Sequence, residues 1–134
     1  MKNSLPDAGA GWRAAPVWVL AYVALWPAPG YAEAVLALGG LAALAVLGIA
    51  RIRGRPAPLG RPALMLAALV FVAYWLPQLV SSLDVPEARG KALAALRYLP
   101  FLWLCGLATA TDKARRVTFG GLAVIVGAWT VDAL

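Results

Sequence analysis

Arg51-Ile52-Arg53-Gly54-Arg55-Pro56-Ala57-Pro58-Leu59-Gly60-Arg61-Pro62 is the stretch that decides the fold. It holds four arginines and no acidic residue, and its prolines prevent a single helix from running through it. Apolar runs, 32–50 and 63–80, lie on either side. Each can form a helix that crosses a bilayer, because about 20 residues at a rise of about 1.5 Å each match a hydrocarbon core of about 30 Å. The stretch therefore predicts a basic loop between two membrane spans.

The composition of the whole chain agrees with a membrane protein. Of its 134 residues, 63% are hydrophobic and 13% are charged, whereas charged residues make up about 25% of an ordinary soluble domain. A soluble domain this small buries only about two-thirds of its surface, so the excess apolar surface is expected to face lipid. The net charge of +6 comes from basic residues between apolar runs. This pattern suits orientation signals better than a nucleic-acid-binding stripe.

Five apolar segments are expected to be membrane-spanning helices: 14–26, 32–50, 63–80, 92–110 and 117–134. A polar lead, 1–13, precedes them. The segments lack the period-two alternation of a β-barrel, and helices satisfy every backbone group in lipid. We therefore expect an all-α polytopic protein in which 14–134 form one transmembrane domain, an antiparallel bundle of about five helices.

The first segment, 14–26, allows two interpretations. As a helix it would be only about 20 Å long, and a Pro-Ala-Pro-Gly break at 27–30 follows it. It is either a short first span or a cleaved signal peptide with its small-residue site at 30–32. Both interpretations place Glu33 on the outer side of the membrane.

Lysines and arginines on alternate sides of the spans indicate the orientation. One side would hold nine of them: Lys2, Arg13, Arg51, Arg53, Arg55, Arg61, Lys113, Arg115 and Arg116. The other side would hold three: Arg89, Lys91 and Arg97. The side richer in cations faces the cytoplasm, so we expect a cytoplasmic N-terminus and an outer loop at 81–91. The expected location is the inner membrane of a bacterium.

Small and aromatic residues within the spans suggest how the helices pack. Three pairs of small residues are four apart, which allows close helix contacts, and we interpret them as internal packing: Gly39 and Ala43, Gly106 and Ala110, Ala123 and Gly127. Most tryptophans lie near span ends, where they would be interfacial anchors. Tyr74 and Trp75 have a second interpretation, a platform for a lipid or a carbohydrate.

Charged residues within apolar runs are costly and therefore informative. Arg97 lies inside the fourth span, and with Arg89 and Lys91 it would place three cations at one outer corner beside a helix start. Such a corner suits a lipid-linked phosphate or diphosphate. In the alternative, Arg97 extends to the interface and Arg89 pairs with Glu87 or Asp84. Asp132, in the fifth segment, is an intramembrane acid of unknown role or an acid at the water surface.

The order of these parts resembles the N-terminal portion of the O-antigen ligase family, membrane glycosyltransferases that share a domain type with O-antigen polymerases. The resemblance rests on the tryptophan-rich hairpin 12–50, the arginine loop, Ser81-Ser82-Leu83-Asp84, and Arg89-Gly90-Lys91 leading to Arg97-Tyr98-Leu99. The basic loop followed by Trp129-Thr130-Val131-Asp132 completes it. It extends over the whole chain but over only about the first third of a typical member.

The resemblance implies a role in lipopolysaccharide biosynthesis. Members transfer polysaccharide from undecaprenyl diphosphate to lipid A-core on the periplasmic face, without a metal or a cofactor. Their essential arginines and histidine lie around a large periplasmic loop in a later region, and this chain has no histidine, so no catalytic residue can be assigned. The resemblance assigns Arg97, Arg89 and Lys91 to the lipid-linked donor. It predicts a fragment that is inactive alone and becomes active only if another chain supplies the rest.

Other functions remain open from the sequence. A non-enzymatic membrane subunit, either a scaffold or a transporter component, would self-associate through the faces of small residues. A holin-like pore former would be toxic on overexpression. The absence of histidine and the single cysteine, Cys105, argue against a metal centre. The expected partners are the lipid bilayer and, as the resemblance implies, a polyprenyl-diphosphate-linked glycan and the missing C-terminal part. A nucleic acid is not expected.

Overall fold

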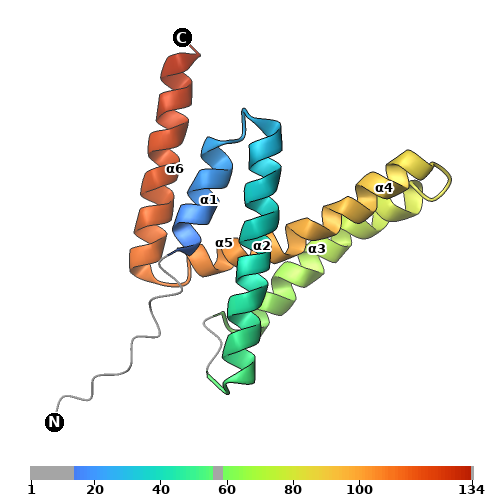
Figure 1. The fold of residues 1–134 in the computed structure, drawn as a ribbon, viewed down its shortest axis with the longest axis horizontal. Helices are drawn as coiled ribbons and strands as arrows, with labels where there is room; N and C mark the ends of the chain where they lie inside the picture. Colours follow the sequence, from blue (N-terminus) through green and yellow to red (C-terminus); the bar gives the residue numbers. More distant parts are fainter. Residues whose placement is uncertain (1–13, 56–58, 134) are drawn as a thin grey trace.

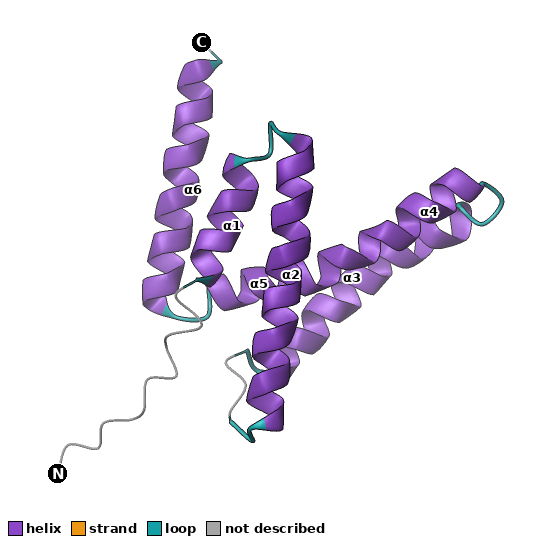
Figure 2. Cartoon of the chain, in the orientation of Figure 1, coloured by secondary structure: helices purple, strands orange, loops and turns teal. Residues whose placement is uncertain are grey.

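The computed structural model describes residues 14–55 and 59–133, and these form helices without any strand (Figure 2). The expected all-α class is thus confirmed. The helices are α1 (Ala15–Ala24), α2 (Pro29–Ile52), α3 (Arg61–Ser81), α4 (Pro86–Ala94), the 3₁₀ turn η1 (Ala95–Arg97), α5 (Tyr98–Ala108) and α6 (Asp112–Asp132). The polar lead 1–13, with Lys2 and Arg13, lies outside the described residues.

Prolines and a glycine set the ends of α2. Pro29 is the first residue of the helix, a position that needs no backbone N–H donor. At the other end Gly54 has a φ of 63°, a conformation that residues with a side chain rarely adopt. The Arg55 N–H donates to the Ala50 carbonyl at 2.9 Å and the Gly54 N–H to Arg51 at 3.2 Å. This Schellman pattern ends α2 within the arginine loop.

Two helices, α4 and α6, begin five or more residues earlier than the sequence predicted. The loop expected at 81–91 is helical from Pro86, which again occupies the first turn, so the outer loop is shorter than predicted. Helix α6 starts at Asp112 and not at residue 117, because the Thr111 hydroxyl caps it by accepting from the Ala114 N–H at 3.2 Å. Charged residues at both places extend the helices rather than interrupt them.

The predicted antiparallel bundle requires all helix axes to be roughly aligned. The helices of the structure are not aligned in this way. In Figure 1, α1, α2 and α6 lie side by side, whereas α3 and α4 form a hairpin that leans away from them. Helix α5 crosses α2 and contacts α1, α2, α3 and α6. It is the element that joins the two groups of helices.

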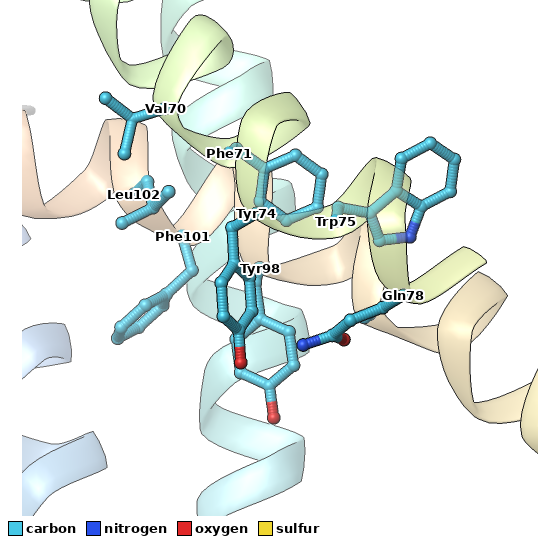
Figure 3. A pocket seen from close by; sticks show the side chains of 9 residues that line it. Val70, Phe71, Tyr74, Trp75, Gln78, Tyr98, Phe101 and Leu102 are labelled. Carbon is cyan, nitrogen blue, oxygen red and sulfur yellow. The ribbon is translucent and has the colours of Figure 1, made fainter. Parts of the chain in front are cut away.

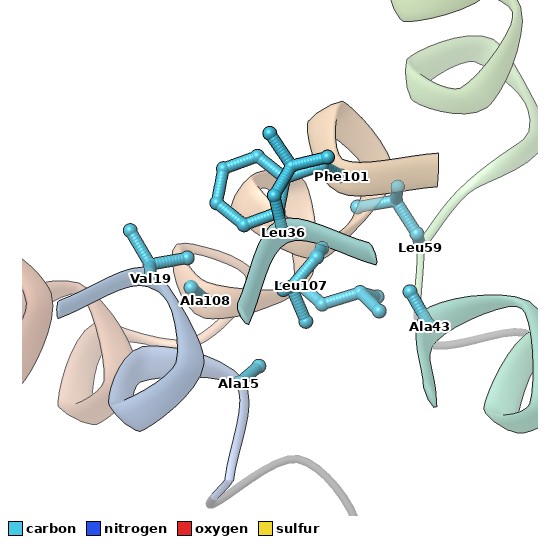
Figure 4. Packing of buried hydrophobic residues seen from close by; sticks show 9 residues of the cluster. Ala15, Val19, Leu36, Ala43, Leu59, Phe101, Leu107 and Ala108 are labelled. Atoms are coloured by element: carbon cyan, nitrogen blue, oxygen red, sulfur yellow. The ribbon is translucent and has the colours of Figure 1, made fainter. Parts of the chain in front are cut away.

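The core forms around α5. Its residues Phe101, Leu104, Leu107 and Ala108 are buried, and Figure 4 shows the side chains of α1 and α2 meeting this face. Leu59 comes from the arginine loop and also enters the core, with 8% of its surface exposed. The loop that the sequence marked as basic therefore also contributes an apolar contact.

The pairs of small residues differ in their packing. A Cβ at Gly39 would lie 2.9 Å from Leu104 and one at Gly106 would lie 3.1 Å from Leu59, so both glycines permit close contacts inside the fold. A Cβ at Gly127, in contrast, would meet no atom within 4 Å. Internal packing accounts for Gly39, Ala43 and Gly106, but not for Ala110, which is exposed, or for the pair on α6.

Two tryptophans link α3 to its neighbours. The Trp75 indole donates to the Ala92 carbonyl of α4 at 2.7 Å, and the Trp103 indole of α5 donates to the Leu64 carbonyl of α3 at 3.2 Å. A buried indole N–H needs such a partner. For these two residues the structure shows contacts between helices in addition to any anchoring role.

Three helical segments are long and apolar enough to cross a membrane: Gly30–Ile52, Arg61–Ser81 and Pro86–Ala108. Helix α3 is apolar on nearly all sides, yet Phe71 is its single buried residue. Such surface is unfavourable in water, so the protein is membrane-associated. Helix α1 has 10 residues, about 15 Å, and α6 begins with charged residues, so neither is among the three segments.

Candidate functional site

Pro100 explains the 3₁₀ turn that holds Arg97. A proline lacks a backbone N–H, and its ring clashes with the carbonyl four residues earlier, here that of Leu96. The helix from Pro86 to Ala108 therefore changes to a 3₁₀ turn at Ala95–Arg97 before α5 begins. The change of helix type places Arg97 against α2.

Gly40 lets the turn approach α2 closely. A Cβ at this position would lie 3.2 Å from Pro100 and 3.7 Å from the Arg97 carbonyl. The Arg97 guanidinium nevertheless pairs with Glu33, whose carboxylate lies 3.3 Å away. Glu33 precedes Gly40 by about two helical turns, or about 10 Å along the axis. The Arg97 side chain thus extends along α2 toward the N-terminal end of that helix.

The Arg97–Glu33 pair is partly open to its surroundings. The side chains of Arg97 and Glu33 are 36% and 61% exposed, respectively. The guanidinium carbon lies 5.8 Å from the centre of the Tyr98 ring, within cation–π range. The Arg97 Nε atom is enclosed and has no hydrogen-bond partner within the described part of the chain. Because Nε is enclosed, an additional acceptor would have to meet the terminal N–H groups of the guanidinium.

An apolar cavity of about 440 Å³ lies between α3 and the η1–α5 segment. Its lining combines aromatic and aliphatic side chains with one carboxamide: Val70, Phe71, Tyr74, Trp75, Gln78, Ala95, Tyr98, Phe101 and Leu102. In Figure 3 the hydroxyls of Tyr74 and Tyr98 and the carboxamide of Gln78 lie at the same end. The cavity thus has an apolar body and a polar end, the distribution that an amphiphile requires.

Tyr98 connects the cavity to Arg97. It lines the cavity and its ring is also the one beside the guanidinium. Arg97 itself does not line the cavity, so the Tyr98 ring is what the cation and the cavity share. Tyr74 and Trp75, which the sequence suggested as a lipid platform, both line it.

The other predicted site residues lie elsewhere. Arg89 and Lys91 are exposed on α4, about 12 Å and 9 Å along the helix from Arg97. Within residues 14–55 and 59–133 the ion pairs are Arg97–Glu33 and Arg115–Asp112. The predicted alternative, a pair of Arg89 with Glu87 or Asp84, is therefore not formed among these residues. Asp132 is exposed at the end of α6. The structure thus brings Glu33, and not Arg89 or Lys91, to Arg97.

The sequence contained a signal for Glu33 that its interpretation did not use. Glu33 and Arg97 are opposite charges in apolar surroundings, and both were assigned to the outer side. Gln78 and Tyr98 carried no comparable signal. Among the described residues no group of three His, Cys, Asp or Glu side chains could hold a metal ion.

Comparisons of the chain with protein-family models, with curated proteins and with solved structures give no match. The geometry at Arg97 and the order of the sequence elements are therefore the two features of the chain that bear on its function.

Proposed function

We propose that this protein is a multi-pass protein of the bacterial inner membrane that binds a lipid-linked phosphate or diphosphate. Arg97 contacts the phosphate, and the adjacent cavity takes the first part of the lipid chain. The observation that carries the proposal is that Tyr98 both lines an apolar cavity with a polar end and flanks the Arg97 guanidinium.

The chemistry of the site suits an anionic amphiphile. Arginine donates through several N–H groups in a planar fork that matches phosphate oxygens. Transfer of an isoprenoid or acyl chain from water into an apolar cavity lowers its free energy. Because both features meet at Tyr98, one ligand can use them together.

The proposed topology places the arginine loop in the cytoplasm and the α3–α4 loop outside. In this arrangement the five apolar segments cross the membrane in alternate directions, and Arg97 and Glu33 lie toward the outer side. Single-cysteine labelling tests it: in a Cys105→Ser background, a membrane-impermeant thiol reagent should modify Asp84→Cys in intact spheroplasts but Arg53→Cys only after lysis. Labelling of Arg53→Cys in intact spheroplasts would refute the orientation.

In the biological setting that the resemblance implies, the ligand is undecaprenyl diphosphate carrying polysaccharide. This chain would bind the donor in an O-antigen-ligase-like reaction. Transfer to lipid A-core would need catalytic groups that residues 1–134 do not supply, because these residues include no histidine. The proposed partners are thus the lipid-linked glycan and a chain that supplies those groups.

The direct test measures binding of farnesyl diphosphate to the full chain in nanodiscs of uncharged lipid. Arg97→Gln should weaken binding about tenfold or more, because a charged hydrogen bond to phosphate contributes about 1.5–3 kcal/mol. Arg89→Gln is the matched control, since it removes the same charge from exposed α4 and should change binding little. Equal affinities of the Arg97→Gln variant and the wild type would overturn the proposed function.

The exposed apolar surfaces favour a second candidate, a non-enzymatic membrane subunit. Met65, Leu66 and Leu69 of α3 are each more than 60% exposed, and the glycine–alanine pair of α6 is open. These faces suit contacts with transmembrane helices of a partner or of a second copy. Self-association in nanodiscs together with no binding of diphosphate would favour this candidate, and lysis on overexpression would favour a holin-like pore.

A further inference from the structure

Glu33 occupies the same guanidinium that the proposed ligand needs. Its carboxylate lies 3.3 Å from a terminal nitrogen of Arg97. A carboxylate and a phosphate compete for the same donors, because both accept in pairs from the guanidinium fork. Assuming the proposed function, we propose that Glu33 is an internal competitor that sets the affinity of the Arg97 site for phosphate-bearing lipids.

The position of Glu33 suits exchange with a ligand. It lies in the second turn of α2, close to the N-terminus of that helix, and its side chain is 61% exposed. When a phosphate binds, the carboxylate can turn to the aqueous side, where solvent and salt weaken its repulsion of the ligand. Arg97 stays in place meanwhile, because its backbone lies against Gly40 and Tyr98 flanks its guanidinium.

An internal competitor gives a cation at a membrane surface selectivity among phosphate-bearing lipids. Phospholipid phosphates are concentrated there, and an unpaired arginine would be occupied by them. Pairing with Glu33 lowers the affinity for every phosphate by the same factor. Weak monophosphate ligands then leave the site empty, while a ligand that also fills the cavity still binds.

A competing role and a positioning role of Glu33 predict opposite changes in phosphate affinity when Glu33 is removed. If Glu33 competes, its removal raises the affinity for phosphate. If Glu33 holds Arg97 in the binding orientation, its removal lowers the affinity. Glu87 provides the matched control. It is an exposed acid near the start of α4, and among the described residues it forms no ion pair with Arg97.

The experiment measures dissociation constants of farnesyl diphosphate and of phosphatidylglycerol for the full chain in nanodiscs of uncharged lipid. Glu33→Gln should tighten both about fivefold, which corresponds to about 1 kcal/mol for a partly exposed ion pair. Glu33→Asp, one methylene shorter, should tighten both by less, and Glu87→Gln should have no effect. In an Arg97→Gln background Glu33→Gln should change nothing.

The outcomes separate the two proposals. Unchanged or weaker binding by the Glu33→Gln variant, with Arg97→Gln still harmful, overturns the competitor and leaves the proposed function standing. If Arg97→Gln has no effect, the proposed function fails first. A thermal unfolding curve of the Glu33→Gln variant, expected within a few degrees of the wild type, confirms that the variant is folded.

Discussion

Replacing Gly40 by leucine tests whether the crossing of α2 and α5 depends on a missing side chain. Gly40 is buried, and a Cβ there would lie 3.2 Å from Pro100 and 3.6 Å from the Phe101 backbone nitrogen. Neither neighbour is a flexible side-chain end, so a leucine must push α5 away from α2. Gly48, in the same helix, is the matched control because a Cβ there meets no atom within 4 Å.

The magnitude follows from two effects of opposite sign. Leucine in place of glycine inside a helix gains about 0.8 kcal/mol in helix propensity, and this gain is common to both positions. Overpacking at Gly40 costs about 1–3 kcal/mol. We therefore expect Gly48→Leu to be neutral or slightly stabilising and Gly40→Leu to be less stable than Gly48→Leu by about 1–3 kcal/mol.

Unfolding in mixed detergent micelles, followed by circular dichroism as the fraction of denaturing detergent rises, gives the free energy of unfolding of each variant. The difference between the two leucine variants isolates packing, because the propensity gain cancels. The Gly40→Leu variant should also bind farnesyl diphosphate more weakly, since Arg97 moves with the displaced turn. Equal stability of the two variants would refute the close crossing of α2 and α5.

Two hydrogen bonds between helices give further predictions. Thr118 is 3% exposed and its hydroxyl donates to the Ala108 carbonyl at the end of α5 at 2.8 Å, so Thr118→Val should destabilise the protein by roughly 1–3 kcal/mol in the same unfolding assay. Thr130→Val, which removes an exposed hydroxyl bonded within its own helix, should cost less than about 0.5 kcal/mol, and equal losses would contradict this reasoning. Trp75→Phe keeps an aromatic ring in the cavity but removes the donor to Ala92, so it should lower the free energy of unfolding by about 1 kcal/mol. A loss no larger than that caused by Trp129→Phe would show that this bond does not hold α3 to α4.

Local sequence determined the helices of this protein. Apolar runs of span length and the scarcity of charge allow little other than helices in a membrane, because lipid offers no partner to an unpaired backbone group. The arginine loop and its prolines marked the break between α2 and α3 correctly. The starts of α4 and α6 were predicted too late, because charge was taken as a sign of loops, although Pro86 and the Thr111 cap begin helices there.

The site was only partly readable from the sequence. Arg97 was singled out because a charge within an apolar run is costly. Tyr74 and Trp75 were noted separately as a platform for a lipid or a carbohydrate. The expected cluster with Arg89 and Lys91 did not form, because positions that follow one another along a helix are separated by its rise and point in different directions. Glu33 was assigned to the same outer side as Arg97, but it is distant in sequence, and local pattern alone did not pair the two residues.

By itself, then, the sequence determined that the chain is helical, that it associates with a membrane, and that Arg97 is exceptional. The tertiary structure alone decided that α5 crosses α2 at Gly40, that Arg97 reaches Glu33 along α2, and that aromatic residues of α3 and α5, Tyr98 among them, line a cavity. The physical reason is that helices such as α3 are apolar on every side. Such helices carry no polar face to reveal which side contacts a neighbour, so the rotation and crossing of each helix depend on close packing between residues that are far apart along the chain.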